Sequence, residues 1–306
     1  MPAPIRNPVY LIGPTACGKS AVALELARRL DAEIVSADSM QVYRGLDIGT
    51  AKPAPAERAV VPHHLIDVVE LTEPFDVACY VALARAAIAD IQRRGKLPLI
   101  VGGSGLYLRS LAQGLCDLPD ADPAFRAELE AMGRERALDE LRRVDPEAAA
   151  RIDPCNLRRV VRALEICRLT GRKSSDLRRE WDREPSPLMH GLQRDRADLR
   201  ARCDARVETM FRAGLVEETR SLLARGLTGN HTACQALGYK EVIVHLRGEM
   251  TLEQAIALVK THTRQFAKRQ DTWFRHQARV EWLAVAPTDA PSMVAETLAH
   301  RFRDAP

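Results

Sequence analysis

The sequence lacks the features of membrane, secreted and zinc-scaffold proteins. No apolar run approaches the roughly 18–20 residues that a transmembrane helix needs. The N-terminal stretch contains no signal-peptide core, so we expect a cytoplasmic protein with no membrane association. The 7 cysteines are odd in number and form no Cys-x-x-Cys pair, which indicates free thiols and no zinc site.

The composition is that of a globular chain with a mild excess of positive charge. Hydrophobic residues make up 46% and charged residues 28% of the 306 residues, which excludes extensive disorder. The net charge of +4 is too small to indicate nucleic-acid binding by itself. Residues 151–225, however, contain 18 basic and 12 acidic residues. A GC-rich genome favours arginine codons, but guanidinium groups also suit phosphate, so an RNA or DNA surface is a hypothesis here.

Short apolar runs alternate with helical patterns over the first 115 residues, as in a doubly wound parallel sheet. We predict strands at 9–12, 33–37, 65–69 and 98–101, and helices at 20–30 and 76–94. Residues 116–187 contain no convincing strand and at least three helical patterns, which predict a small all-helical insertion domain. Further strands are predicted at 189–192 and 280–285, with helices at 197–213, 215–225, 251–275 and from 291. The core domain is thus expected at 1–115 and 188–306.

One motif has the spacing of a phosphate-binding loop. Gly13-Pro14-Thr15-Ala16-Cys17-Gly18-Lys19-Ser20 matches G-x-x-x-x-G-K-[ST] between a predicted strand and a predicted helix. Its glycines let backbone N–H groups face one anion, and the helix N-terminus and Lys19 add positive charge. The Ser20 hydroxyl is a suitable ligand for Mg²⁺, the expected cofactor. The fold class is therefore α/β, a P-loop NTPase-like parallel sheet flanked by helices with a helical insertion.

The phosphate-binding loop alone does not identify the reaction. No Asn-Lys-x-Asp motif is present, which argues against a GTPase. Strand 98–101 ends in glycines rather than in an acid, which argues against a motor or helicase ATPase. The loop can therefore hold a diphosphate leaving group. Asp38 follows strand 33–37 at the edge where open α/β sheets bind ligands. An aspartate there often only forms a turn, but its proximity to the loop favours a function.

Several segments together resemble the tRNA dimethylallyltransferase family of bacteria, also called tRNA isopentenyltransferases. They are the phosphate loop, 38–43, 49–53 and 101–104, followed in the same order by 121–123, 159–165, 235–240 and 268–275. The likeness extends through most of the chain. Two departures preserve residue size: Ser104 stands where many relatives have Thr, and Cys17 where Ser is frequent.

The resemblance implies a prenyl transfer. Family members move a dimethylallyl group from dimethylallyl diphosphate to N6 of the adenosine 3′-adjacent to the tRNA anticodon and release diphosphate. It implies that Lys19 and Arg206 act on the diphosphate together with the phosphate loop. It also implies that Asp38 accepts the N6 proton. The expected partners are the tRNA anticodon arm and dimethylallyl diphosphate, and the expected oligomeric state is a monomer.

The resemblance further implies a set of tRNA-binding residues. Those near the target adenine are Asp38, Ser39, Met40, Gln41, Ser104 and Arg126. Those on the anticodon arm are Arg158, Arg159, Val160, Val161, Arg162, Gln235, Ala236, Leu237, Gly238, Tyr239, Lys240, Lys268, Arg269, Gln270, Asp271, Thr272, Trp273, Phe274 and Arg275. Cations interleaved with aromatic side chains suit loops whose bases are splayed and stacked. Core packing for Trp273 and a solvated face for the arginines are the alternatives.

Three other functions compete with this interpretation. An adenylate dimethylallyltransferase would share the loop and Asp38 but would not need the insertion or the basic segment near Lys268. A small-molecule P-loop kinase would consume ATP, and a nucleotide-switched RNA-binding protein would modify nothing. The insertion and the basic segment favour tRNA. His63 and His64 have no other metal ligands nearby in the sequence and are expected to be structural.

Overall fold

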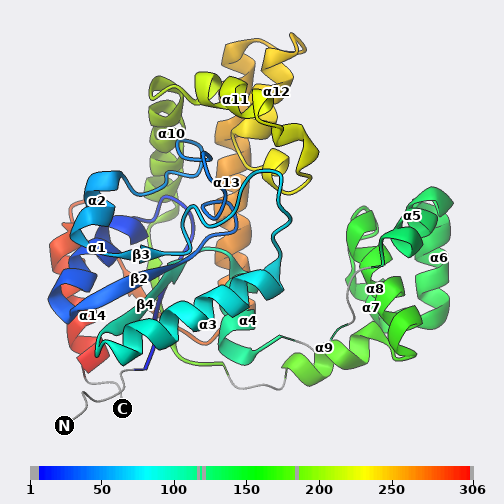
Figure 1. Cartoon of the computed structure of the whole chain (residues 1–306), viewed down its shortest axis with the longest axis horizontal. Helices are drawn as coiled ribbons and strands as arrows, with labels where there is room; N and C mark the ends of the chain where they lie inside the picture. The colour runs from blue at the N-terminus through cyan, green and yellow to red at the C-terminus, as the bar shows by residue number, and fades with distance from the viewer. Residues whose placement is uncertain (1–6, 116–117, 119–121, 183–185, 304–306) are drawn as a thin grey trace. The chain divides into compact units, whose positions relative to one another are not determined.

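A computed structural model describes residues 7–115, 118, 122–182 and 186–303. The chain divides into two units, one of residues 1–112 and 186–306 and the other of residues 113–185 (Figure 1). These bounds lie within a few residues of the expected 116 and 187. Within the described residues, no helix has the length and apolarity that crossing a membrane requires.

The larger unit is built on a six-stranded sheet whose strand pairings, among the described residues, are all parallel. Its strands are β1 (Val9–Ile12), β2 (Ala32–Ala37), β3 (His63–His64), β4 (Leu97–Gly102), β5 (Met189–Gln193) and β6 (Val280–Ala284). Their order is β3-β2-β4-β1-β5-β6. The parallel α/β fold predicted from the sequence is therefore confirmed.

The register brings three strand ends to one place. Ile12 of β1 and Ala37 of β2 are both aligned with Gly102 of β4. The residues that follow these strands, Gly13, Asp38 and Gly103, therefore emerge side by side at the carboxyl edge of the sheet. This is the edge at which open parallel sheets bind ligands.

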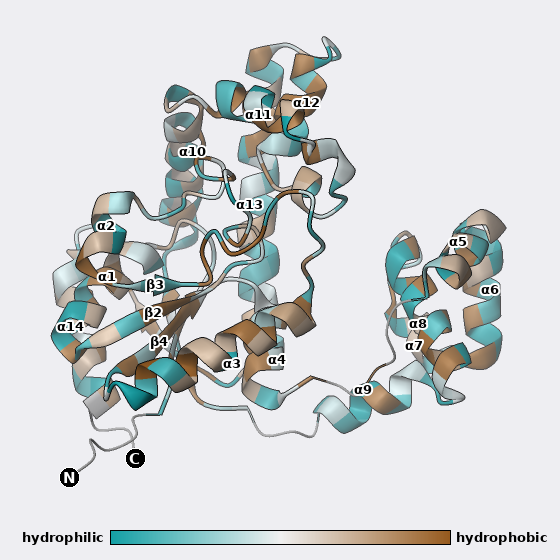
Figure 2. Ribbon diagram, viewed as in Figure 1, coloured by the Kyte–Doolittle hydropathy of each residue, from teal (hydrophilic) through white to brown (hydrophobic). Residues whose placement is uncertain are grey.

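Helices cover both faces of the sheet. Leu11 belongs to the core with α1 (Lys19–Leu30) and α14 (Pro291–Arg303), whereas Tyr10 and Ile12 face α3 (Val77–Arg93) and α4 (Gly105–Gln113). This switch between neighbouring residues is the period-two alternation of a buried strand. Figure 2 shows β4 as largely brown, with teal on the outer sides of the covering helices.

The rest of the larger unit is helical. It contains α2 (Pro55–Val60), α10 (Arg196–Arg212), α11 (Leu215–Ala224), α12 (Tyr239–Leu246), α13 (Leu252–Gln277), and the 3-10 turns Leu227–Gly229 and Ala233–Gln235. Helices α10 and α13 pack side by side, and α11 and α12 pack on the loop that follows β2 (Figure 1). This packing places both long helices beside the carboxyl edge of the sheet.

The predicted strand 65–69 is wrong. Within residues 63–69, only His63 and His64 pair with β2. Val69 forms one isolated bridge with Tyr43. Leu65 and Asp67 have φ angles of 63° and 56°, in the left-handed region that interrupts an extended strand. The apolar run there fills the core from a loop instead.

The smaller unit is helical throughout its described residues. It contains α5 (Pro123–Met132), α6 (Arg134–Val144), α7 (Pro146–Arg151), α8 (Leu157–Thr170) and α9 (Ser174–Asp182). Its core is formed mainly by α5, α6 and α8, with Leu141, Val160 and Leu164 among the buried residues. Helices α5 to α8 each have an apolar side toward this core, and brown and teal alternate along them in Figure 2.

A buried carboxylate joins two of these helices. Asp145, 0% exposed, caps α7 and accepts a hydrogen bond from the Ala148 N–H at 3.1 Å. It also accepts from the Ser174 hydroxyl at 2.8 Å, and from the Ser175 N–H and hydroxyl at 2.8 and 2.7 Å, all at the start of α9. Burial alone would raise the pKa of Asp145, but these hydrogen bonds hold it below its ordinary value.

We predict that Asp145→Asn lowers the free energy of unfolding by about 2–3 kcal/mol at neutral pH, because an amide cannot satisfy four donors. The native pKa is below the unfolded value of about 4, so the carboxylate stabilises fully above that pH and its contribution is lost as the pH falls. The difference between parent and variant should therefore shrink in urea unfolding below about pH 4. Asp139→Asn, at an exposed partner of Arg142, is the control, and equal effects of the two variants would contradict the prediction.

Candidate active site

The phosphate-loop motif connects β1 to α1 as a tight turn. Ala16 and Gly18 have φ angles of 64° and 102°, so the backbone reverses its curvature twice before the helix begins. The Lys19 ammonium donates to the carbonyls of Gly13 and Pro14 at 2.7 and 2.8 Å. Ser20 is exposed in the first turn of α1. The loop thus has the backbone turn, the lysine and the helix N-terminus that an anion site requires.

Two arginines donate hydrogen bonds to carbonyl groups of this loop. Arg202 Nε donates to the carbonyl of Ala16 at 2.9 Å, and Arg194 Nε donates to that of Cys17 at 2.8 Å. Arg194 is held in turn by Asp198 at 2.8 Å. The cations thus fix loop carbonyls, so they support its conformation. Sequence reasoning missed Arg194, which precedes α10 and lies four residues before its partner Asp198.

Asp38 is held in a turn at the end of β2. Its Oδ1 accepts hydrogen bonds from the N–H groups of Met40 and Gln41 at 2.9 and 3.3 Å. The adjacent Ser39 N–H donates to Ser104 Oγ at 3.0 Å, which joins this turn to the loop after β4. Asp38 therefore has the turn-forming role expected of such an aspartate. Among the described residues, no hydrogen bond occupies its Oδ2.

Arg206 of α10 provides a cation beside this carboxylate. Its Nη2 donates to the carbonyl of Thr50 at 3.2 Å, and Gln41 Nε2 donates to the same carbonyl at 3.3 Å. Burial lowers the pKa of the Arg206 guanidinium, and the negative charge of Asp38 opposes that shift. A partly buried cation to which no carboxylate of the described residues is directly bound is well prepared to receive an anion.

These groups line one cavity of about 810 Å³ in the larger unit. Its wall includes Thr15, Ala16 and Gly18–Ser20 of the phosphate loop, the turn from Asp38 to Gln41, Gly49–Pro53, Gly102–Ser104, Arg202, Arg206, Gln235–Leu237, Arg269 and Gln270. The volume lies within the range of small-molecule and cofactor sites. The cavity can therefore hold an anionic group at the loop and a second reactant near Asp38.

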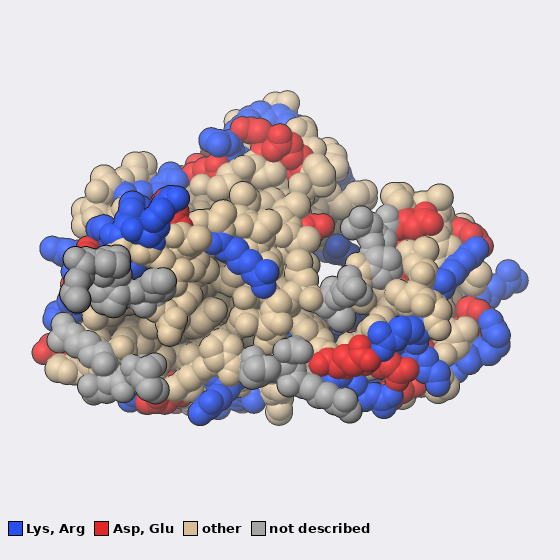
Figure 3. All heavy atoms as spheres, turned by 60° about the horizontal axis from the view of Figure 1, so that its bottom comes forward, with Lys and Arg blue, Asp and Glu red and all other residues tan. Residues whose placement is uncertain are grey.

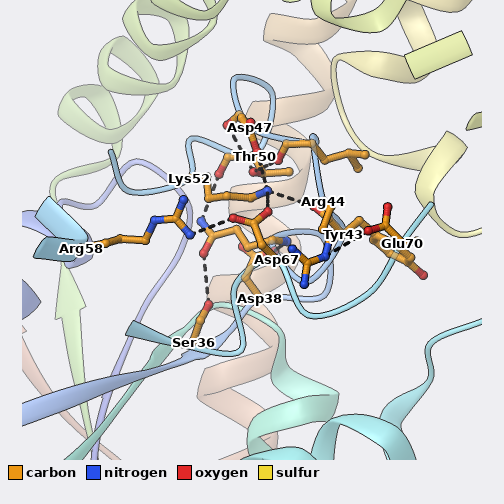
Figure 4. A network of polar contacts seen from close by, with 12 residues as sticks. Ser36, Asp38, Tyr43, Arg44, Asp47, Thr50, Lys52, Arg58, Asp67 and Glu70 are labelled. Atoms are coloured by element: carbon orange, nitrogen blue, oxygen red, sulfur yellow. Dashed lines mark hydrogen bonds and ion pairs between the residues drawn. The ribbon is translucent and has the colours of Figure 1, made fainter. Parts of the chain in front are cut away.

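A buried lysine holds the loop that carries Thr50. Lys52, whose side chain is 3% exposed, donates to the Tyr43 carbonyl at 2.9 Å and to Asp47 and Asp67 at 2.5 and 2.6 Å (Figure 4). Arg58 contacts the second oxygen of Asp67 at 2.8 Å. Burial would raise the pKa of Asp67, but the two cations hold it below its ordinary value.

The same loop is fixed from α11 and α12. The Tyr239 hydroxyl donates to Glu218 Oε1 at 2.6 Å and accepts from the Gly49 N–H at 3.0 Å. Glu218 also accepts from the Ile48 N–H at 3.0 Å. Tyr239 is completely buried in these contacts, so its ring cannot stack on a base.

Several other residues that the resemblance assigns to tRNA are also buried. They are Val160, Val161, Ala236, Gln270 and Phe274. The two valines belong to the core of the helical unit, and Phe274 belongs to the core under α3 and α4. Their side chains therefore pack in the protein interior, and the tRNA contacts implied for them stay predictions. The physical reason is helical periodicity, because apolar residues within an otherwise basic segment fill the inner face of the same helix.

Except for Gly238, which is buried, the remaining members of that set are at least partly accessible, but several have acidic partners. Arg126 and Arg162 both pair with the buried Glu165, at 2.9 and 2.5 Å. Arg275 pairs with Asp271 at 2.9 Å. Trp273 is partly buried against Phe274, edge to face at 5.4 Å. Gln235, Lys240 and Thr272 are exposed, and Leu237, Gly238 and Asp271 are more covered.

Five cations of the set are exposed and have no acidic partner among the described residues: Arg158, Arg159, Lys240, Lys268 and Arg269. Two others on α13 are neutralised, Lys260 by Glu208 at 2.6 Å and Arg264 by Asp204 at 3.0 Å. On the face shown in Figure 3, basic and acidic side chains interleave over the helical unit. The positive surface available to a partner is therefore smaller than the arginine count suggests.

The cavity has the donor chemistry for magnesium. Within the described ranges, no group of three or more His, Cys, Asp or Glu side chains is arranged to hold a metal ion by itself. Mg²⁺ usually needs only one or two protein oxygens, because substrate phosphates and water complete its octahedron. The Ser20 hydroxyl and the Asp38 carboxylate line the same cavity and are oxygens of this kind. His63 and His64 bond instead to the Val61 carbonyl and to Glu33, both at 2.7 Å.

The parallel sheet, the loop and the cavity define a phosphate-loop protein. Two family models match it, "IPP transferase" over residues 41–277 and "Isopentenyl transferase" over residues 7–73. The chain belongs to the IPP transferase family. The resemblance seen in the sequence is thereby confirmed.

Several known proteins match this chain over nearly its whole length. It is 47% identical to tRNA dimethylallyltransferase 1 of Trichlorobacter lovleyi, over 92% of this chain and 95% of that protein. It is 49% identical to tRNA dimethylallyltransferase of an Anaeromyxobacter species, over 96% and 97%. The solved tRNA isopentenylpyrophosphate transferase of Bacillus halodurans aligns with a TM-score of 0.72 and 41% identity, covering 98% of this chain and 97% of that one. A eukaryotic dimethylallyltransferase acting on tRNA aligns with a TM-score of 0.81 and 28% identity, covering 98% and 80%.

We predict that Lys52→Met costs about 2–3 kcal/mol of unfolding free energy, because it removes a buried ammonium and leaves the Tyr43 carbonyl and the partly buried Asp67 without this donor. Amide exchange of Ala51 and Lys52, whose N–H groups bond within this loop, should accelerate. Arg58→Met removes the more exposed partner of Asp67 and should cost less than about 1 kcal/mol. If the two variants were equally stable and exchanged alike, Lys52 would not hold the loop.

Proposed function

We propose that this chain transfers a dimethylallyl group from dimethylallyl diphosphate to N6 of the adenosine 3′-adjacent to the anticodon of tRNA, and releases diphosphate. One observation carries the proposal: in a chain of the IPP transferase family, a phosphate loop and a carboxylate at the ends of the two strands that flank β4 line a single cavity. The cavity thus offers a place for the leaving group beside a proton acceptor.

The phosphate loop and two cations act on the donor. The exocyclic amine is a weak nucleophile because its lone pair is delocalised into the ring. The allylic carbon must therefore become cation-like, and stabilisation of the departing diphosphate dominates the barrier. The loop N–H groups, Lys19 and Arg206 provide that stabilisation. Ser20 would hold Mg²⁺, which when bound neutralises diphosphate charge.

Asp38 acts on the acceptor. As the bond from N6 to C1 of the prenyl group forms, the C1–O bond to diphosphate breaks and its electron pair leaves with that oxygen. The amine proton passes to Asp38 Oδ2, while Oδ1 stays fixed by the Met40 and Gln41 amides. The turn thus holds the acceptor oxygen in one orientation.

The tRNA contacts involve the exposed, unneutralised cations. Arg158 and Arg159 of α8, and Lys268 and Arg269 of α13, are suited to phosphates of the anticodon arm. A monomer in the cytoplasm completes the proposal, since every role falls to one chain and the substrate is tRNA.

Product analysis tests the function. The protein is incubated with dimethylallyl diphosphate and an anticodon stem-loop that has an adenosine 3′ to the anticodon, and the digested nucleosides are analysed by mass. We expect N6-dimethylallyladenosine and free diphosphate. Transfer to AMP in place of the stem-loop would identify an adenylate dimethylallyltransferase, and consumption of ATP without prenylation would identify a kinase.

We predict that Asp38→Asn lowers the single-turnover rate by about 10²-fold or more, the scale of a positioned base, and leaves tRNA affinity close to the parent value. Asp31→Asn, at the opposite end of α1 from the phosphate loop, is the matched control and should retain the parent rate. A parent-like rate for the Asp38 variant would remove this carboxylate from the mechanism.

We predict that Arg159→Ala and Lys268→Ala each weaken tRNA binding and make the dependence of log affinity on log salt shallower by about 0.7–0.9. Each lost phosphate contact releases one fewer condensed counterion. Arg143→Ala, an exposed arginine already paired with Glu140, is the control within the helical unit. Parent-like slopes for both test variants would show that these cations are an ordinary solvated surface.

A further inference from the structure

Gln270 links the two loops of the cavity through one side-chain amide. Its Oε1 accepts a hydrogen bond from the Thr15 N–H of the phosphate loop at 2.8 Å. Its Nε2 donates to the Gly103 carbonyl, after β4, at 3.0 Å. These partners fix the amide orientation, since an N–H requires the oxygen and a carbonyl requires the nitrogen. The residue is only 9% exposed, although its neighbours Lys268 and Arg269 are exposed.

The backbone opposite Gln270 is shaped to admit it. A Cβ atom added at Gly103 would lie 2.3 Å from Gln270 Nε2, a distance that no side chain tolerates without moving the amide. The absence of a side chain at residue 103 therefore makes the hydrogen bond possible. Gln270 and Gly103 form a complementary pair contributed by α13 and the β4 loop.

The β4 loop in turn reaches the proton acceptor. Gly103 precedes Ser104, whose hydroxyl accepts from the Ser39 N–H next to Asp38 at 3.0 Å. The Ser104 N–H donates to the Ala37 carbonyl at 3.1 Å. A continuous set of hydrogen bonds therefore connects Thr15 through Gln270 and Gly103 to the turn of Asp38.

We propose that Gln270 is a positioning residue that fixes the separation between the diphosphate loop and the Asp38 turn. The assignment rests on the proposed prenyl transfer, in which N6 and the leaving oxygen must be aligned on opposite sides of C1. A displacement of about 1 Å in such a geometry can cost about 10²-fold in rate. Gln270 contacts neither substrate in this role, and the tRNA contact that the family resemblance implies for it is replaced.

The substitution Gln270→Met tests the role, because methionine keeps the length of the side chain and removes both hydrogen bonds. We expect the single-turnover rate at saturating donor and stem-loop to fall by about 10–100-fold, with stem-loop affinity within about 2-fold of the parent. Amide exchange of Thr15 should accelerate in the same variant. Gln265→Met, the same change at an exposed position of α13, should alter none of these quantities.

A double-mutant cycle separates positioning from simple loss of packing. Gly103→Ala alone should also slow transfer, since its Cβ displaces the amide. In a Gln270→Ala background, where that amide is gone, Gly103→Ala should slow transfer little further. Independent effects of the two substitutions would overturn the pairing.

Other outcomes are equally decisive. Weaker stem-loop binding with a parent-like saturating rate would make Gln270 an RNA contact and overturn the proposal. A parent-like rate together with faster Thr15 exchange would show that the hydrogen bond does not position the reaction. An inactive parent protein would overturn the prenyl transfer and this role together, whereas an active parent with an unaffected variant overturns the role of Gln270 alone.

Discussion

The parallel register of β1, β2 and β4 is the constraint on which the site depends. Because Ile12 and Ala37 both align with Gly102, the phosphate loop, the Asp38 turn and the Gly103 loop begin at one edge. A shift of one residue in either ladder would move a loop by about 3.3 Å along the strand and turn its side chains to the other face. Charge stabilisation and proton transfer therefore share a cavity through strand pairing, before any side chain contributes.

Local sequence patterns were sufficient for the parts of the site that local chemistry creates. The phosphate loop needs its glycines, its lysine and a following helix, all within eight adjacent residues, so the motif predicts its own geometry. Asp38 was predictable because strand ends converge in any parallel sheet. The confirmed α/β fold follows from the same alternation of strands and helices.

What the sequence could not reveal depends on contacts between distant residues. Leu65 and Asp67 adopt left-handed backbone conformations, which an apolar run in the sequence does not predict. The pairing of Arg126 with Glu165 joins α5 to α8, and Arg162 pairs with the same carboxylate from within α8, so these contacts change which arginines are available. Gln270 stands in a basic segment, and only the packed helix shows that its amide faces inward.

The Thr50 carbonyl has a consequence for how this site can vary. This oxygen accepts hydrogen bonds from both Arg206 and Gln41, yet it is a backbone atom that every amino acid has. Replacing the side chain at residue 50 leaves the acceptor in place, whereas adding or deleting one residue between Tyr43 and Lys52 would carry it away from both donors. Variation among homologous chains should therefore tolerate substitution in this loop far better than a change in its length.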